Sequence, residues 1–309
     1  MTKPAPPPGA TTQTKLFREG QLQWEGGGEA HTPVVEEGSS AQFADISKHK
    51  VARAAACIYC GGTHGLSREH IIPYALGGTT TIPNGSCETC RKKTHAFETD
   101  VLRGPMKMVR FVQGMPSGTD HEDAPRTVSF KVVKRDGTEE DLTVATKAGP
   151  VFLPFPQFDP PKYLAPGADQ RLKLIGTATA SWGAGHEDFM RANGARSLTY
   201  QVDRNKPVAF ARMVAKIAYC FAWSDDQLRH LQNPSDLPRT FLDDPDNIGK
   251  FVGGSDEPLT RYQGLQHRLE VAVNLDNRIM FMRVQLFAAA GTPTYIVVLG
   301  TLKDGYSLT

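Results

Sequence analysis

The stretch that decides the fold of this chain runs from Cys57 to Cys90 and reads CIYCGGTHGLSREHIIPYALGGTTTIPNGSCETC. It holds four of the five cysteines of the 309-residue chain, in the pairs Cys57/Cys60 and Cys87/Cys90. Two C-x-x-C pairs place four thiolates so that each pair binds one side of a tetrahedral Zn²⁺. The spacing therefore predicts a structural zinc site with no open position for chemistry. Four unrelated buried cysteines are the alternative, because free cysteine is common in protein cores.

The residues between and after the cysteine pairs predict two short strands and a helix. SREHIIP (67–73) is typical of a strand that ends at its proline, and Gly77-Gly78 allow a sharp reversal of the chain. RKKTHAFETDVLR (91–103) has apolar residues at helical spacing. We expect these elements to be held together by the metal ion.

The rest of the chain predicts an α+β fold that is mostly antiparallel. TVSFKVVKRDGTEEDLTVAT (127–146) alternates apolar and polar residues on both sides of Asp136-Gly137, which indicates a hairpin. Apolar residues at helical spacing behind Pro207 predict a helix that reaches Trp223. A Pro-rich connection is expected at 153–167, and further strands are expected at 171–180, 267–275, 278–287 and 293–300.

Composition sets the class of protein and the division into domains. The chain is 39% hydrophobic and 22% charged, which is ordinary for a globular protein. No apolar run reaches the roughly 18 residues that cross a membrane, and the N-terminus lacks the apolar segment of a secretory signal. We therefore expect a cytoplasmic protein, where paired cysteines bind metal rather than form disulfides. We divide the chain into a flexible Pro/Gly-rich arm (1–45), the cysteine module (46–112) and an α+β domain of unassigned role (113–309).

The order of motifs in the cysteine module resembles a known family. C-x-x-C is followed by acid-His-Ile-x-Pro, Gly-Gly, Asn and a second C-x-x-C, which is similar to the HNH endonucleases of the zinc-stapled ββα-metal kind. The resemblance extends to a bacterial and phage subgroup with E-H-I-I-P, S-C-x-x-C and T-x-x-F-E, and it covers about 45 residues. It implies a small ββα-metal module that hydrolyses DNA phosphodiester bonds with the help of Mg²⁺ or Mn²⁺, and it suggests a role in restriction or phage defence.

The same resemblance implies roles for three residues. His70 would be the general base that takes a proton from the attacking water, because neutral imidazole is abundant near pH 7. Glu69 would be the acidic ligand of the catalytic ion. Asn84 would hold His70 in orientation, although it lies three residues before Cys87 rather than the more usual five. The alternative is that Glu69 and His70 form a surface pair on a strand.

One position departs from the family pattern. Many members carry Asn or His directly after the last cysteine as the second ligand of the catalytic ion, and this chain has Arg91, whose guanidinium cannot bind a cation. Residues 91, 94, 95 and 98 share one helix face. His95 is our predicted second ligand, by similarity to the nuclease colicins, with Glu98 as a deeper carboxylate that binds or orients the ion. The alternative is that both merely cap and solvate the helix.

Basic residues are concentrated in this module. Residues 48–110 hold ten Lys or Arg against four Asp or Glu, whereas the whole chain has a net charge of only +2. A local excess of this kind favours phosphate binding, although a basic run is usually only a solvated face. The candidate DNA contacts are Arg68, Arg91, Lys92 and Lys93.

Two functions of different class follow. The first is a metal-dependent DNA endonuclease, and the second is a zinc-stapled nucleic-acid-binding module without cleavage activity, for which Arg91 is the main argument. DNA is the partner in both, no membrane is involved, and homo-oligomer formation stays open. On the helix behind Pro207, Cys220 is expected in the core, while Arg212 and Lys216 are expected on an exposed face.

Overall fold

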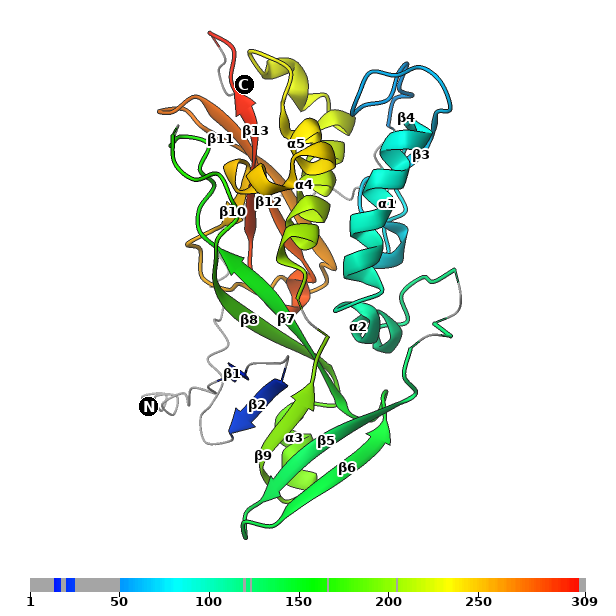
Figure 1. Cartoon of the computed structure of the whole chain (residues 1–309), viewed down its shortest axis with the longest axis vertical. Helices are drawn as coiled ribbons and strands as arrows, with labels where there is room; N and C mark the ends of the chain where they lie inside the picture. The colour runs from blue at the N-terminus through cyan, green and yellow to red at the C-terminus, as the bar shows by residue number, and fades with distance from the viewer. Residues whose placement is uncertain are drawn as a thin grey trace, which may run out of the picture.

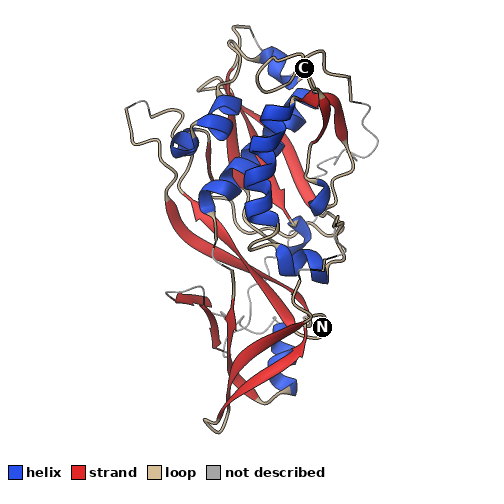
Figure 2. Ribbon diagram, turned by 45° about the vertical axis from the view of Figure 1, so that its right-hand side comes forward, coloured by secondary structure: helices blue, strands red, loops and turns tan. Residues whose placement is uncertain are grey.

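The computed structural model describes residues 14–17, 21–25, 51–118, 121–122, 124–165, 167–203 and 205–305. The molecule is elongated, with a helix-covered sheet and the cysteine module at one end and a second sheet at the other (Figure 1). A long two-stranded ribbon joins the two ends (Figure 2). The predicted α+β class is confirmed, because helices are mixed with sheets whose strand pairs are antiparallel.

The cysteine module has the predicted strand, strand and helix. Its elements are β3 (Ser67–His70), the 3-10 helix η2 (Tyr74–Leu76), β4 (Thr81–Ser86), α1 (Glu88–Leu102) and α2 (Lys107–Val112). Strand β3 pairs antiparallel with β4, and His70 lies opposite Thr81. The double glycine allows the reversal between them: Gly77 has a φ of +84°, and a Cβ on Gly78 would lie 1.9 Å from the carbonyl oxygen of Ile72.

Helix α4 (Pro207–Ser224) lies between the cysteine module and a four-stranded sheet (Figure 1). The strand order of that sheet is β10 (Val252–Gly254), β13 (Tyr295–Thr301), β12 (Ile279–Leu286) and β11 (His267–Asn274). Helix α4 and strands β11, β12 and β13 confirm the elements predicted for this part of the sequence, whereas β10 was not predicted. The chain after α4 also contains short helices: η3 (Gln227–His230), α5 (Leu237–Asp243), η4 (Pro245–Lys250) and η5 (Ala288–Ala290).

The second sheet contains three strands that the sequence did not predict, which come first in its strand order. Its order is β1 (Thr14–Phe17), β2 (Gln21–Glu25), β9 (Ala195–Gln201), β5 (Thr127–Lys134) and β6 (Glu139–Ala145). The predicted hairpin at Asp136-Gly137 joins β5 to β6. Strands β1 and β2 fall within the predicted flexible arm. They pair with each other, and β2 also pairs with β9. The rest of that arm lies outside the described residues.

The ribbon between the two ends consists of β7 (Pro150–Phe158) and β8 (Leu174–Gly183). Part of it is the stretch expected as a Pro-rich connection, and that expectation is wrong for residues 153–158. Pro150, Pro154 and Pro156 all fall on alternate positions of β7, which pairs with β8 on one side only. Because alternate backbone N–H groups point to the same side, the three missing donors can face the unpaired edge, where proline is tolerated in a strand.

One large hydrophobic core joins the cysteine module to the C-terminal part of the chain. It contains Phe97 and Val101 of α1 together with Ile217 of α4 and Phe241 of α5. The guanidinium of Arg212 lies 4.6 Å from the centre of the Phe97 ring. A second, smaller core lies under β5, β9 and α3 (His186–Ala192) in the other sheet. Whether residues 46–112 fold as a separate unit stays a prediction.

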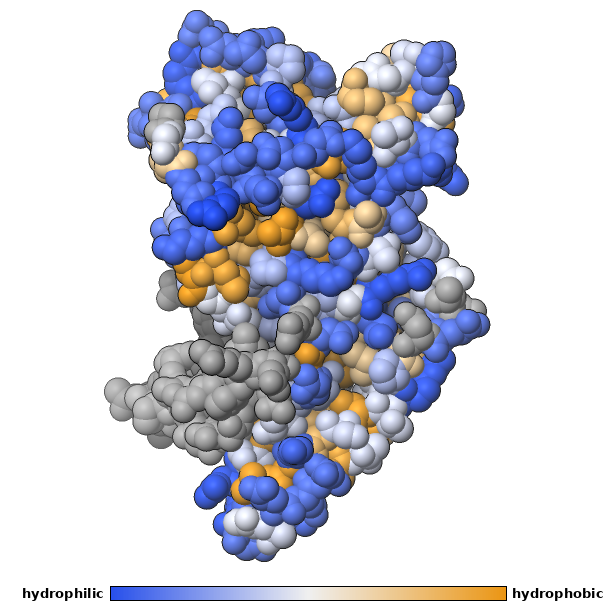
Figure 3. Space-filling model, in the orientation of Figure 1, coloured by the Kyte–Doolittle hydropathy of each residue, from blue (hydrophilic) through white to orange (hydrophobic). Residues whose placement is uncertain are grey.

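Within the described ranges, no helix is both long and apolar enough to span a bilayer. Hydrophilic residues cover most of the face seen in Figure 3, and apolar residues appear there as separate patches.

Candidate active site

The four paired cysteines form one cluster. The sulfur atoms of Cys57, Cys60, Cys87 and Cys90 all lie within 4.8 Å of one another, and the Sγ atoms of Cys60 and Cys87 are 3.7 Å apart. A tetrahedron with Zn–S bonds of about 2.3 Å has S···S edges of about 3.8 Å. The cluster could therefore hold a metal ion such as zinc.

Local backbone structure brings the two pairs together. Cys57 and Cys60 flank a tight turn in which the N–H of Gly61 donates to the carbonyl of Cys57 over 2.9 Å. Cys87 is the N-cap residue of α1 and Cys90 lies in the first helical turn. Hydrogen bonding from the backbone N–H of Cys90 lowers the pKa of the Cys87 thiol to about 7, which favours the thiolate that a metal requires.

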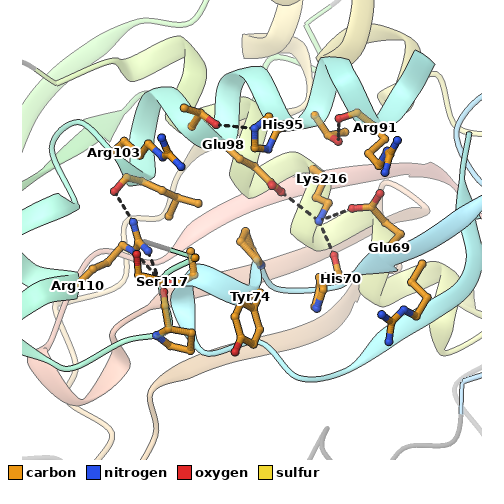
Figure 4. A pocket seen from close by; sticks show the side chains of 18 residues that line it. Glu69, His70, Tyr74, Arg91, His95, Glu98, Arg103, Arg110, Ser117 and Lys216 are labelled. Atoms are coloured by element: carbon orange, nitrogen blue, oxygen red, sulfur yellow. Dashed lines mark hydrogen bonds and ion pairs between the residues drawn. The ribbon is translucent and has the colours of Figure 1, made fainter. Parts of the chain in front are cut away.

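A cavity of 290 Å³ is lined by residues of β3 and α1, the strand between the cysteine pairs and the helix that holds Cys90. It is lined by six residues that the sequence singled out and by cationic and aromatic side chains that it did not (Figure 4). The six predicted residues are Arg68, Glu69, His70, Arg91, His95 and Glu98, and the others include Tyr74, Arg103, Arg110 and Lys216. Five cationic side chains thus face two carboxylates, so the cavity suits an anionic ligand.

The deepest group of the cavity is the ammonium of Lys216, which reaches in from α4. Its Nζ lies 2.8 Å from Oε1 of Glu69 and 3.1 Å from Oε1 of Glu98, and it donates a hydrogen bond to the backbone carbonyl of His70 (Figure 4). The expectation that Lys216 is exposed is wrong, because its side chain is only 1% exposed. Burial favours the neutral amine, but the carboxylates of Glu98 and Glu69 outweigh it and raise the pKa of Lys216 above its usual value.

The burial of Lys216 does have a signal in the sequence, although its spacing alone predicted an exposed residue. Lys216 is the lone charge within MVAKIAY (213–219), and the structure buries all seven of these residues. A charged side chain in a helix that is apolar all round must be buried, and a buried charge needs a partner. Arg212, one turn earlier, is also drawn inward: its guanidinium donates to the carbonyls of Phe241 and Leu242 over 2.6 and 3.2 Å.

His70 lies at the end of β3 with its ring in the lining of the cavity. The ring centre is 5.8 Å from that of Tyr74. Partial burial, and after it the positive charge of Lys216, lowers the pKa of His70 below its usual value. The imidazole is therefore mostly neutral at pH 7, the form that can accept a proton.

The structure does not bring Asn84 into this cavity. Asn84 lies in β4 with a φ of 60°, a left-handed conformation that asparagine adopts more readily than most residues. Its predicted role in orienting His70 stays a prediction. Lys92 and Lys93 are also outside the lining: Lys92 pairs with Glu88 at 2.7 Å, and Lys93 pairs with Asp243 of α5.

The three predicted ligands of a catalytic ion do not converge in this arrangement. Among the described residues, the four cysteines are the one group of three or more potential ligands whose binding atoms all lie within 4.8 Å of one another. Glu69 and Glu98 both contact Lys216 instead. His95 is exposed, and its Nε2 lies 3.4 Å from Oγ1 of Thr99. The residues therefore do not fit a divalent ion held by all three.

Comparison with known proteins identifies the segment that carries this site. Residues 57–103 match the family model described as HNH endonuclease. We refer to residues 57–103 as the HNH segment. The HNH segment includes the four cysteines, His70 and all of α1, but Lys216 lies outside it. No curated protein and no solved structure matches the chain.

Gly85 of the HNH segment leaves room for Glu69, which gives a first prediction. A Cβ on Gly85 would lie 2.7 Å from the Cβ of Glu69, so one of the two strands has to move. We expect Gly85→Ala to lower the free energy of unfolding by about 1–3 kcal/mol, as overpacking usually does. Gly118→Ala is the control. Gly118 lines the same cavity as Glu69, but a Cβ there would meet no atom within 4 Å. Equal stability of the two variants in chemical denaturation would contradict this packing argument.

Proposed function

We propose that the protein is an endonuclease that hydrolyses DNA phosphodiester bonds with His70 as the general base. The observation that carries the proposal is the position of the His70 side chain, from the HNH segment, in the lining of a cationic cavity. The lowered pKa of His70 supports the role of a base. His70 would take a proton from a water molecule, which attacks phosphorus in line with the departing oxygen. Arg68, Arg91 and Arg103 line the same cavity and can bind the phosphate oxygens.

The cation requirement of this reaction is part of the proposal. We expect Mg²⁺ or Mn²⁺ to support cleavage, with Glu69, His95 and Glu98 as the predicted ligands. Carboxylate oxygens suit these ions, but Lys216 already contacts both carboxylates. The ligands do not converge as they stand, so we assign no step of the proposed reaction to the ion.

A structural zinc ion is the second part of the proposal. Four thiolates complete the tetrahedral shell of Zn²⁺, so an ion at this cluster would stabilise the turn and helix α1 without taking part in hydrolysis. A cytoplasmic location, a role in restriction or phage defence and the formation of a homo-oligomer stay predictions.

A nucleic-acid-binding module without cleavage activity is the second candidate function. Two observations favour it: Arg91 stands where many family members have an ion ligand, and an ammonium is bound to the acidic pair. Both candidates use the same cationic cavity. They differ in whether a phosphodiester bond is cut.

The zinc assignment predicts about one tightly bound Zn²⁺ per chain, measured by elemental analysis of the purified protein. Cys57→Ser should lower the zinc content and the unfolding temperature, because it removes one of four ligands. Cys220→Ser is the matched control: Cys220 is buried but contacts Tyr59 rather than the cluster, so zinc should be retained. Protein that contains no zinc, or a Cys57→Ser variant with unchanged zinc content, would contradict the assignment.

The role of His70 predicts a loss of catalysis without a loss of fold. His70→Ala should lower the rate of plasmid nicking by about 10²–10⁴-fold, the usual contribution of a general base. Zinc content should be unchanged, since His70 is not part of the cysteine cluster. His64→Ala serves as the control, because His64 is an exposed histidine of the same segment that does not line the cavity. Nicking by His70→Ala at the wild-type rate would exclude His70 as the base, and no nicking by the wild type with any ion would favour the binding module.

Arg91 and His95 lie one turn apart on α1, and we expect their substitutions to have different effects. Arg91→Ala should weaken DNA binding and reduce the slope of its salt dependence by about 1, as expected for one lost phosphate contact. His95→Ala should leave DNA binding nearly unchanged but raise the Mg²⁺ or Mn²⁺ concentration that half-maximal nicking requires. Arg135→Ala, at the distant β5–β6 turn, is the control for charge. If Glu98→Ala changes the ion requirement and His95→Ala does not, Glu98 is the ligand and His95 is excluded.

A further inference from the structure

The contacts of Lys216 differ from those of an ordinary surface lysine. An ammonium has three hydrogen atoms, and three oxygen atoms surround this one: a carboxylate oxygen of Glu69, one of Glu98 and the carbonyl oxygen of His70. These acceptors come from β3 and α1, whereas Lys216 comes from α4. One side chain from outside the HNH segment therefore joins its strand to its helix.

The two carboxylates depend on this cation. Glu69 is 6% exposed, and its partner Glu98 is largely buried as well. With both carboxylates ionised beside a single ammonium, the three groups carry a net charge of −1, and without the ammonium that charge would be −2. Burial raises the pKa of Glu98, and the charge of Lys216 opposes that rise. Removing one member of a buried ion cluster is strongly destabilising, because the remaining charges stay out of water without a partner.

The ammonium also occupies the carboxylate oxygens that a divalent ion would need. Oε1 of Glu69 and Oε1 of Glu98 both lie within 3.1 Å of Nζ. A divalent ion that binds both oxygens has to displace Lys216. Displacement is costly, because α4 is fixed in the main core on both sides of Lys216, through Met213, Ile217 and Cys220.

We propose that Lys216 is a positioning residue of this active site: it is the built-in cation of the Glu69–Glu98 pair and holds the backbone of His70. The inference rests on the proposed function, since Glu69 and His70 are the groups that it positions. The acidic pair then binds divalent ions weakly in the native protein, because an ammonium already occupies it. Replacing Lys216 with an uncharged residue uncovers a site for a hard divalent cation.

The test compares three zinc-loaded proteins in the absence of DNA: wild type, Lys216→Met and the triple variant Lys216→Met/Glu69→Gln/Glu98→Gln. Unfolding temperature is measured with and without Mn²⁺, and Mn²⁺ binding is followed by the electron paramagnetic resonance of the free ion. Lys216→Met should unfold about 10 °C below wild type and regain at least half of that on addition of Mn²⁺. It should also bind one Mn²⁺ at least about tenfold more tightly than wild type.

The triple variant separates charge from packing. It has lost the same lysine, but it holds no carboxylate that needs a counter-cation at this position. We expect it to unfold well above the temperature of Lys216→Met and to gain little from Mn²⁺. If Lys216→Met does not fold but the triple variant does, the role of Lys216 as counter-cation is supported.

Two results would overturn the inference. One is Mn²⁺ binding by the wild type that is as tight as binding by Lys216→Met. The other is a triple variant that is as unstable as Lys216→Met, or that does not fold, because the lysine would then act through packing. None of these measurements depends on DNA cleavage. A wild type that never cuts DNA would refute the endonuclease proposal while leaving the counter-cation result intact.

Discussion

The burial of helix α4 constrains the rest of this structure. Its apolar residues point to all sides, so the helix has to be covered on all sides: by the four-stranded sheet on one, by α1 of the HNH segment and by α5 on others. A helix of this kind holds a single fully buried charge, at Lys216. That charge requires anionic partners, and the strand and helix of the HNH segment supply them. The position of the cavity relative to the sheet follows from this pairing.

Local patterns in the sequence were enough to predict most of the regular structure. The cysteine spacing predicted the four-thiol cluster, Asp136-Gly137 predicted the β5–β6 hairpin, and Pro207 marked the start of α4. The turn and the helix start are signals of a few residues, and only residues 61–86 separate the two C-x-x-C pairs, so no pairing between distant parts of the chain had to be known. Strand β2 was missed because its backbone partners lie on β9, nearly 180 residues away and itself not predicted, and β1 joins the same sheet through β2. Strand β7 was missed because its prolines are compatible with a strand only when one edge has no partner.

The candidate site was predicted in part for the same reason. Glu69, His70, His95 and Glu98 are close in sequence or share one helix face, and all line one cavity. Lys216 could not be placed there from spacing, because it reaches the site through the packing of α4 against α1. Asn84 was assigned from its place in a motif, but it has a left-handed backbone conformation within β4 and is not among the residues that line the cavity.

Glu69 and Glu98 of the HNH segment depend on Lys216, which lies outside that segment. The segment therefore cannot be transferred to another protein without a replacement for this lysine. A chain cut after residue 112 would retain the cysteine cluster and His70, yet it would expose the apolar face of α1 and leave two neighbouring carboxylates without their cation. A different protein could accept this segment only by supplying both an apolar surface and one buried positive charge at the matching place. Recombination that moves the segment alone would thus be selected against, and α4 and the HNH segment are expected to be inherited together.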